Sequence, residues 1–331
     1  MSVEDTDFNN DLAILCDISD LESITGAIFI LIFVFSVTGN LLVLAILLFG
    51  EKLKNITSLF ILNLACSDLV FTLTLPFWAY YQLHHWVFGE YACKLLTAAY
   101  IVGVNSSVIL LTALTVDRFV TVVLQWPNDP SRRKRFAVVS CTAAWLISAA
   151  ASVNDAITVK VETQWNNLSS CEDTSPESHV NLGYYLHVSL LFFLPFTIIV
   201  FCYSFILKTV LQASKRRTYC TVVMILCIVA AFFICWGPYN ILLIVKIFYK
   251  PQSCYAEDTL YVAYSVCRII AYSHCCMNPL LYMIPKTSRK HIWSILCCRN
   301  SKKKERDNVA GQSTTTMHNA AFTVQNSTVF L

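Results

Sequence analysis

The sequence predicts an all-α membrane protein, a seven-transmembrane helix bundle with a short amphipathic helix after the seventh span. Two observations support this: the long apolar stretches in the 331-residue chain, and the distribution of basic residues between them. A helix needs about 20 apolar residues to cross roughly 30 Å of hydrocarbon. Seven stretches of about this length carry at most two charged or histidine side chains each: Ile24–Phe49, Asn55–Leu83, Leu95–Val116, Phe136–Asn154, Val180–Leu207, Thr218–Val245 and Thr259–Pro285.

The basic residues predict how these spans are oriented. An odd number of spans puts the two termini on opposite sides, and 19 of the 24 Lys and Arg residues fall in the loops and tail of one side. Because cytoplasmic loops carry the excess of Lys and Arg, we expect a multi-pass protein of the plasma membrane with an extracellular N-terminus. The net charge of +3 hides this split and does not indicate binding to nucleic acid.

Residues 1–23 form an acidic N-terminal arm. The arm contains no Lys or Arg, so it lacks the basic segment of a secretory signal peptide. We expect a flexible extracellular arm that either keeps the chain solvated or attracts a basic partner, since opposite charges speed encounter. Its acidic residues are Glu4, Asp5, Asp7, Asp11, Asp17, Asp20 and Glu22.

Residues 24–285 are predicted to form one domain, the seven-helix bundle, because no loop is long enough to fold on its own. The longest outer loop contains the sequon Asn167-Leu168-Ser169, so Asn167 is a candidate glycosylation site on the extracellular side.

The segment after the last span is predicted to lie on the inner leaflet. Residues 286–298 alternate apolar and basic side chains at helical spacing, which is typical of a membrane-surface helix that contacts lipids. Cys297 and Cys298 end it and are candidates for palmitoylation. Residues 299–331 are polar and are predicted to be a disordered cytoplasmic tail. Its candidate phosphorylation sites are Ser313, Thr314, Thr315 and Thr316.

Four of the 15 cysteines lie in the extracellular zone: Cys16, Cys93, Cys171 and Cys254. Four cysteines allow three pairings, and sequence alone does not choose between them. A bridge from Cys93 at the start of the third span to Cys171 in the loop after the fourth span fits the topology. A bridge from Cys16 to Cys254, which would join the arm to the last outer loop, fits it as well.

Each apolar span also carries a polar, aromatic or proline motif, and polar groups inside a membrane are functional suspects. In order, these motifs are Gly39-Asn40, Leu64-Ala65-Cys66-Ser67-Asp68, Asp117-Arg118-Phe119, Trp145, Pro195 with Tyr203, Cys235-Trp236-Gly237-Pro238 and Asn278-Pro279-Leu280-Leu281-Tyr282. Taken together, over about residues 24–298, they resemble the signature of rhodopsin-class G-protein-coupled receptors.

A second set of motifs resembles the chemokine receptors within that class: Thr74 to Trp78, His84 to Gly89, and Ser273 to Pro279. Ser58 to Phe71, Trp236 to Asn240 and Cys267-Arg268 most resemble the XC (lymphotactin) type. The chain departs from the pattern at Arg268, where most chemokine receptors carry a Glu that meets the amino group of the ligand. The arm also contains no Tyr, so the tyrosine sulfation common in the family is not expected there.

The resemblance implies a ligand cavity open to the outside. The residues expected to line it are Trp78, Tyr100, Tyr239, Tyr264, Arg268 and Tyr272. A charge as deep as that of Arg268 is costly unless it is paired. We therefore expect an acidic group to meet it, either from the ligand or from Asp155, Glu172 or Asp173.

The resemblance also implies an activation switch. Asp117 would hold Arg118 in the resting state, and on activation Arg118 would turn to contact the G protein while Tyr203 and Tyr282 rearrange. Trp236 and Pro238 would give the sixth span a hinge, because proline removes one backbone hydrogen bond. The remaining switch residues are Asn278 and Pro279 in the seventh span.

Asp68, Ser107 and Asn278 would converge in the middle of such a bundle. A buried carboxylate needs a partner or a proton, and in the family this partner is a sodium ion, which would act as an allosteric modulator. A protonated or simply hydrogen-bonded Asp68 is the alternative, because Gly103 supplies no ligand one turn before Ser107. No other cofactor is expected, and His274 is expected to be structural.

The resemblance thus implies a receptor that binds a small basic chemokine, and it favours a chemokine similar to lymphotactin. It would activate a heterotrimeric G protein, of the inhibitory class, to drive chemotaxis and calcium signalling. Receptor kinases and an arrestin would act on its tail. The alternative is a scavenging receptor that internalises ligand without signalling, although the Asp117-Arg118 pair argues against it. The sequence does not favour an enzyme, a retinal pump or a transporter, since the seventh span has no Lys and the chain has no internal repeat.

Overall fold

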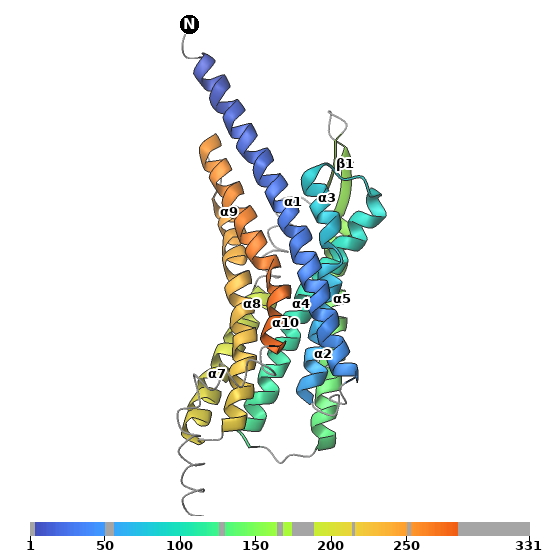
Figure 1. The fold of residues 1–331 in the computed structure, drawn as a ribbon, viewed down its shortest axis with the longest axis vertical. Helices are drawn as coiled ribbons and strands as arrows, with labels where there is room; N and C mark the ends of the chain where they lie inside the picture. Colours follow the sequence, from blue (N-terminus) through green and yellow to red (C-terminus); the bar gives the residue numbers. More distant parts are fainter. Residues whose placement is uncertain are drawn as a thin grey trace, which may run out of the picture. The chain divides into compact units, whose positions relative to one another are not determined.

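The computed structural model describes residues 4–49, 56–125, 130–163, 168–173, 189–213, 216–249 and 253–283 (Figure 1). Met1–Tyr282 form one compact unit, and the predictions for residues 286–298 and 299–331 lie outside the described residues. The elements are α1 (Glu4–Phe49), α2 (Ile56–Thr72), α3 (Leu75–Leu83), α4 (Gly89–Val122), α5 (Pro130–Thr158), β1 (Val159–Thr163), β2 (Ser169–Asp173), the π-helical turn η2 (Ser189–Phe193), α7 (Leu194–Ala213), α8 (Arg216–Phe248), α9 (Cys254–Tyr272) and α10 (His274–Met283).

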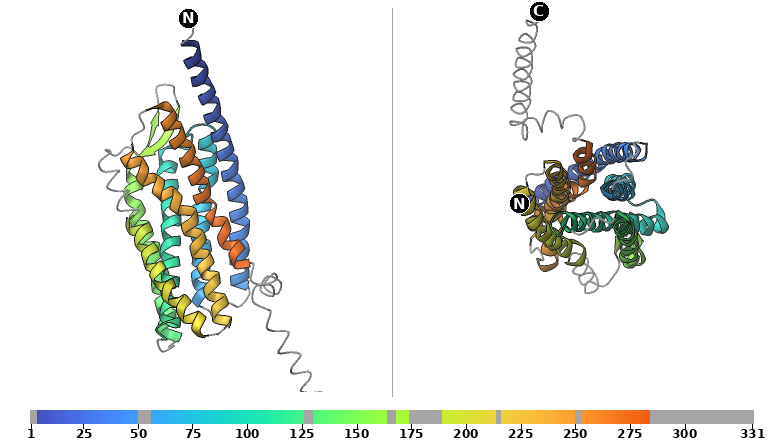
Figure 2. Two further views of the ribbon diagram at one scale, coloured as in Figure 1. Left: turned by 90° about the vertical axis from the view of Figure 1, so that its left-hand side faces the viewer. Right: turned by 90° about the horizontal axis from the view of Figure 1, so that it is seen from below.

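These helices confirm the predicted seven-helix bundle. Six segments of the described chain are long and apolar enough to cross a membrane: 21–48, 56–83, 89–122, 131–158, 189–212 and 225–246. The seventh span is divided at Ser273 into α9 and α10, and α9 carries Glu257, Asp258 and Arg268, so neither half has the length and apolarity of the other spans. Figure 2 shows the helices running side by side within this unit.

The N-terminal arm has a helical backbone, which was not predicted. Helix α1 begins at Glu4 and runs without a break into the first span. The reason lies in the sequence, because residues 4–25 contain neither Gly nor Pro and nothing interrupts the helix.

Prolines lie at a break in one span and inside two others. The second span breaks between Thr72 and Leu75, just before Pro76, and the hydroxyl of Thr74 donates to the carbonyl of Phe71 at 2.7 Å. Pro238 lies inside α8 and Pro279 inside α10. Each proline removes a backbone donor from its helix, and so each provides a place where a span can flex.

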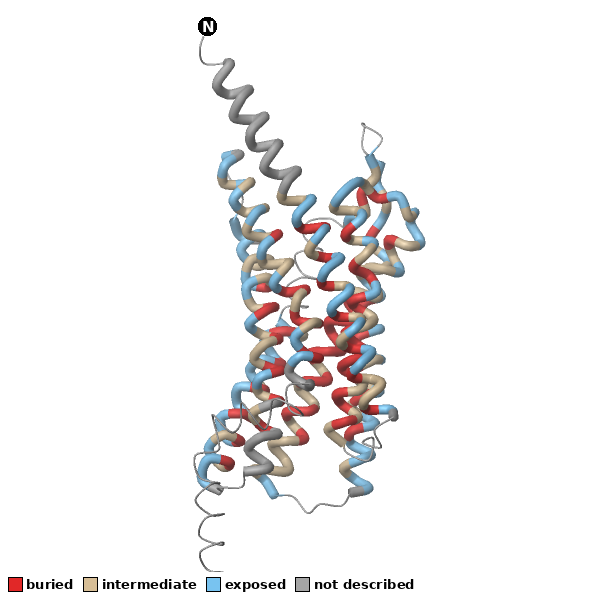
Figure 3. Tube along the Cα trace, in the orientation of Figure 1, coloured by how far each residue is buried: buried red, intermediate tan, exposed pale blue. Residues whose placement is uncertain are grey.

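Helix α4 forms the centre of the bundle and is the most buried of the six spans. Gly103 lets α4 approach α2, since a Cβ atom at this position would lie 2.7 Å from the Cβ of Phe71. Figure 3 shows the buried residues on the faces that the helices turn toward one another. The exposed outward faces are apolar, for example at Phe35 and Leu146, which suits contact with lipid.

The loop after α5 forms an antiparallel hairpin, β1–β2, which the sequence did not predict. Cys171 in β2 is bonded to Cys93 in α4, which confirms the first predicted bridge. The backbone N–H of Trp86 donates to the carbonyl of Ser169 at 2.7 Å, so the hairpin is also pinned to the loop before α4. The side chains of Cys16 and Cys254, and all of Asn167, lie outside the described residues.

Removing this disulfide is expected to destabilise the end of the bundle that carries the β1–β2 hairpin. The bond closes a sequence separation of 78 residues, and losing a native disulfide costs about 2–4 kcal/mol. We expect C93S and C171S each to lower the Tm of the purified protein by roughly 5–10 °C, and the double variant to be no worse than either single one. C227S, at an exposed free thiol, is the matched control. A double variant that loses clearly more than the single ones would contradict this prediction.

Candidate functional site

Arg268 of α9 lies in an aromatic cluster in the half of the bundle that carries the β1–β2 hairpin. Its Nη2 donates to Oε1 of Gln82 in α3 at 2.5 Å. Its guanidinium carbon lies 5.2 Å from the ring centre of Phe29 and 5.4 Å from that of Tyr264. Cation–π contacts of this kind stabilise a partly desolvated cation, so the site holds Arg268 in place without giving it a counter-charge.

A chain of hydrogen bonds through two neutral side chains links Arg268 to an acid, Glu22. Gln82 donates to the hydroxyl of Tyr261 at 3.3 Å, and this hydroxyl donates to Glu22 at 2.9 Å. Among the described residues, no carboxylate lies within ion-pair distance of Arg268, and its Nε is buried without a hydrogen-bond partner. The structure therefore does not pair Arg268 with Asp155 or Glu172, and the side chain of Asp173 lies outside the described set.

Four of the other predicted cavity residues gather near Arg268. The hydroxyls of Tyr239 and Tyr264 lie 3.4 Å apart, and the ring centres of Tyr100 and Tyr272 are 5.7 Å apart. Trp78 instead packs at 5.5 Å on the ring of Trp86, beside the disulfide. Sequence reasoning missed Phe29, Gln82, Tyr261 and Glu22. Of these, Gln82 gave a signal as an amide near the end of an apolar run, and Glu22 was named only as one acid of the N-terminal arm.

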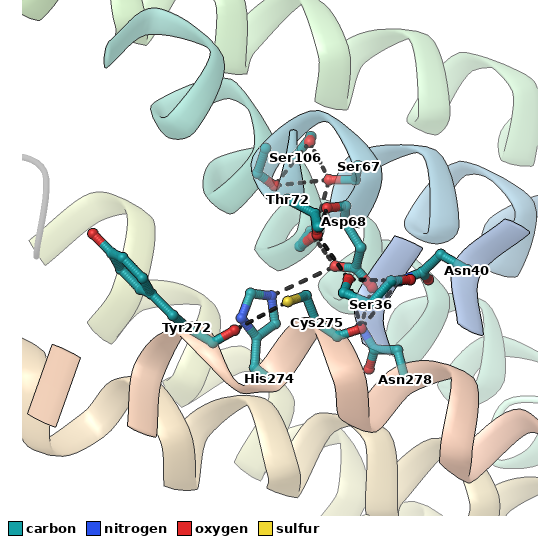
Figure 4. A network of polar contacts seen from close by, with 12 residues as sticks. Ser36, Asn40, Ser67, Asp68, Thr72, Ser106, Tyr272, His274, Cys275 and Asn278 are labelled. Atoms are coloured by element: carbon teal, nitrogen blue, oxygen red, sulfur yellow. Dashed lines mark hydrogen bonds and ion pairs between the residues drawn. The ribbon is translucent and has the colours of Figure 1, made fainter. Parts of the chain in front are cut away.

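Asp68 is the centre of a polar network in the middle of the bundle (Figure 4). Its carboxylate accepts hydrogen bonds from Nδ2 of Asn278 at 2.7 Å and from the hydroxyl of Ser107 at 3.3 Å. Nε2 of His274 lies 3.5 Å from the same carboxylate, while Nδ1 of this ring faces the carbonyl of Ala271 at 3.0 Å. The structure thus brings together the three predicted residues and adds His274 from the break between α9 and α10.

The network extends to α1 on one side and to α4 on the other. The hydroxyls of Ser36 and Thr72 lie 2.7 Å apart, and Nδ2 of Asn40 donates to the carbonyl of Cys275 at 3.1 Å. Ser67 contacts Ser106 and Ser107 of α4 through its hydroxyl. Three transmembrane segments are therefore joined to α10 by buried hydrogen bonds, and a rearrangement of α10 has to disturb them.

The donors around Asp68 suit a small cation in part. Hard cations take oxygen ligands, and the carboxylate of Asp68 and the hydroxyls of Ser67 and Ser107 supply them. Gly103 supplies none, and His274 presents a nitrogen on one side. A sodium ion at Asp68 therefore remains a prediction. It would stabilise the resting arrangement by holding α2 and α4 together.

The sodium prediction is tested by agonist binding. We expect sodium chloride to weaken agonist binding by roughly fivefold relative to N-methylglucamine chloride, because a ligand of the resting state opposes activation. The D68N variant should lose this dependence. If the agonist affinity of the wild-type receptor does not change with sodium, Asp68 is simply hydrogen-bonded and holds no sodium ion.

Trp236 of α8 lies between the outer cluster and the Asp68 network. Its ring centre is 6.2 Å from that of Tyr272 and 5.4 Å from that of His274. Its Nε1 has no hydrogen-bond partner although it is buried. Because Pro238 follows two residues later inside α8, a displaced Tyr272 would push directly on the segment of α8 that proline weakens.

At the opposite end of the bundle, near the end of α4, Asp117 contacts a residue that the sequence did not assign to it. Arg133 of α5 donates from Nε and Nη2 to the two carboxylate oxygens of Asp117, at 2.9 and 2.7 Å. Nε of Arg118 lies 3.9 Å from Asp117, beyond hydrogen-bond distance. Tyr203 of α7 is buried, its hydroxyl without a partner, and the side chain of Tyr282 lies outside the described residues.

Comparison with known families agrees with this geometry. Residues 39–282 match the sequence model of the family described as 7 transmembrane receptor (rhodopsin family). The chain belongs to this family. The predicted class is therefore confirmed, and the family is one of membrane receptors rather than enzymes.

Two relatives with similar sequences narrow the classification of the receptor within this family. It is 38% identical to human "Chemokine XC receptor 1" over 277 residues, which cover 81% of this chain and 80% of the relative. It is 32% identical to "G-protein coupled receptor E1" of equine herpesvirus 2 (strain 86/87) over 280 residues, which cover 82% of this chain and 73% of the relative. The resemblance to XC-type receptors noted from the motifs thus extends over most of the receptor.

Proposed function

We propose that this receptor binds a small basic chemokine outside the cell and activates a heterotrimeric G protein of the inhibitory class, which drives chemotaxis and calcium signalling. The observation that carries the proposal is the outer cluster: a half-buried cation, Arg268, held by aromatic rings and a neutral amide, with no carboxylate beside it among the described residues. The similarity to human Chemokine XC receptor 1 favours a chemokine of the lymphotactin type as the ligand.

The ligand is proposed to supply the missing acid. A flexible segment of the chemokine would enter among the tyrosines and place a carboxylate on the guanidinium of Arg268. Such a pair, formed away from water, gives affinity and orientation together. The rest of the small basic protein would meet acidic groups on the outer surface of the receptor, which include Glu22 at the rim.

Binding is proposed to reach the cytoplasmic side through contacts that the structure contains. Tyr272 belongs to α9 and touches Trp236, and Trp236 touches His274 of the Asp68 network. A ligand that pulls on Arg268 shifts α9 by one or two ångströms, moves Trp236 and bends α8 at Pro238. The bundle then has two arrangements, and the ligand stabilises the one in which Arg118 contacts the G protein.

The remaining expectations stay proposals at this stage. They are a plasma-membrane location with an extracellular N-terminus, glycosylation at Asn167, palmitoylation at Cys297 and Cys298, and phosphorylation of the tail by receptor kinases with recruitment of an arrestin.

The experiment that tests the function is a G-protein activation assay in cells that express the receptor, challenged with a full chemokine panel that includes lymphotactin. A dose-dependent response to lymphotactin alone supports both the receptor class and the ligand type. A response to other chemokines keeps the class and changes the ligand. Binding and uptake of labelled chemokine without a G-protein response would replace the proposal with a scavenging receptor.

A further inference from the structure

The cytoplasmic end of the bundle places two guanidinium groups beside one buried carboxylate. The side chain of Asp117 is 2% exposed, that of Arg118 is 14% exposed and that of Arg133 is 29% exposed. A carboxylate this deep has to be paired. The two arginines therefore compete for it, and their geometry shows which one holds it.

Arg133 donates hydrogen bonds to both carboxylate oxygens of Asp117. Its Nε donates to Oδ1 and its Nη2 donates to Oδ2, which is the parallel two-bond arrangement that planar guanidinium forms best with a carboxylate. Arg118 is left with Nε 3.9 Å from Oδ2, and its Nε and Nη2 are buried without any hydrogen-bond partner. The residue expected to be locked by Asp117 is thus only loosely attracted to it.

The position of Arg133 follows from how α5 begins. Pro130 is the first residue of α5 and fits the first turn, where no N–H is needed. One turn later Arg133 faces α4 and is half-buried, whereas Arg132, Lys134 and Arg135 are exposed. Of the four basic residues in this run, the helix turns Arg133 toward α4, where it reaches Asp117.

We propose that Arg133 is a positioning residue for Arg118: by holding Asp117 from the second cytoplasmic loop, it keeps Arg118 available to the G protein and so sets the basal activity of the receptor. The proposal rests on the G-protein coupling proposed above. When Arg133 is removed, the buried Asp117 turns to the nearest remaining cation of the described residues, which is Arg118. The switch arginine is then held more firmly in its resting place.

The test is a set of four chains: wild type, R133Q, D117N and the double variant D117N/R133Q. Each is purified into nanodiscs, and the basal rate of nucleotide exchange on an inhibitory-class G protein is measured per folded receptor. We expect R133Q to lower the basal rate by roughly threefold and D117N to raise it. The double variant should match D117N, because Arg133 acts only through Asp117.

Two further variants separate positioning from general effects of charge. R135Q removes a neighbouring exposed arginine and should leave the basal rate unchanged. R133K keeps the charge but loses the two-bond geometry, so it should fall between wild type and R133Q. A basal rate that is unchanged or raised in R133Q, while D117N raises it, would overturn the proposal.

A second readout does not depend on coupling. If the pair exists, R133Q and D117N should each speed backbone hydrogen exchange in the first turns of α5, with no further gain in the double variant. If no chain, wild type or variant, catalyses nucleotide exchange above the rate of nanodiscs without receptor, the proposed G-protein coupling fails. Hydrogen exchange then tests by itself whether Arg133 pairs with Asp117. Unchanged hydrogen exchange in both single variants would overturn the assignment of Arg133.

Discussion

Replacing Arg268 with Glu is expected to lower the potency of the activating chemokine by roughly 100-fold or more. Removing one member of a buried, hydrogen-bonded charge pair costs about 2–5 kcal/mol, and each 1.4 kcal/mol is a factor of ten. The substitution also places a new carboxylate beside Gln82, which is itself linked to Glu22 by two hydrogen bonds through Tyr261. The loss should appear both in the EC50 for G-protein activation and in the Kd of labelled chemokine.

Control variants separate a direct contact from a long-range effect of charge. K246E makes the same change of charge on an exposed lysine that stacks on Tyr264 at 4.5 Å. Because exposed charges are screened by salt, K246E should cost far less than R268E. R268K keeps the charge without the fork and should be intermediate. If R268E leaves the potency of every cognate chemokine unchanged, Arg268 has no role in ligand binding.

A charge exchange would identify the partner. Chemokine variants in which each acidic residue of the flexible segment is replaced by Lys should bind the wild-type receptor weakly. One of them should regain potency on R268E. No recovery by any variant, together with a normally folded R268E receptor, would point to an internal role in which Arg268 only fixes Gln82.

Much of this architecture could be predicted because each membrane span has to be a long apolar segment, which the sequence shows without knowledge of its neighbours. A run such as Ile24–Phe49 needs no partner to be recognised as a span. The Cys93–Cys171 bridge was predicted from the topology of the spans, and the meeting of Asp68 with Asn278 was predicted from family motifs; the structure forms both. The remaining details depend on helix phase and tilt, which a linear pattern does not contain.

The missed contacts show this dependence. Tyr261 and Glu22 are 239 residues apart and meet only because α1 and α9 lie side by side at a particular rotation. Arg133 could be recognised as basic, but not as the one residue of its run that turns toward Asp117. The β1–β2 hairpin was missed because its strands are short and are held by a disulfide and by Trp86 rather than by their own pattern. The helical backbone of the arm was not predicted because its acidic composition does not specify a backbone conformation.

Replacing Arg118 with Gln is expected to abolish G-protein activation while leaving chemokine binding within about threefold of the wild type. Arg118 lies in the last turns of α4, its Nε and Nη2 have no hydrogen-bond partner, and Asp117 attracts it only at 3.9 Å. Glutamine has similar length but lacks the cation that a G protein would meet. The loss in signalling should exceed tenfold, since hydrogen bonds to a charged group contribute about 1.5–3 kcal/mol.

Comparing R118Q with R268E separates an effect on G-protein coupling from an effect on ligand binding. The two arginines lie at opposite ends of the bundle and share no contact, so their effects on ligand binding should be independent. R268E should weaken binding and signalling together, whereas R118Q should uncouple them. The measurement is chemokine Kd beside nucleotide exchange on the same nanodisc preparation, with D117N as a variant that keeps Arg118 and removes its neighbour. If R118Q signals at wild-type level, Arg118 is not the residue through which this receptor reaches a G protein, and the basal effect assigned to Arg133 would need another route.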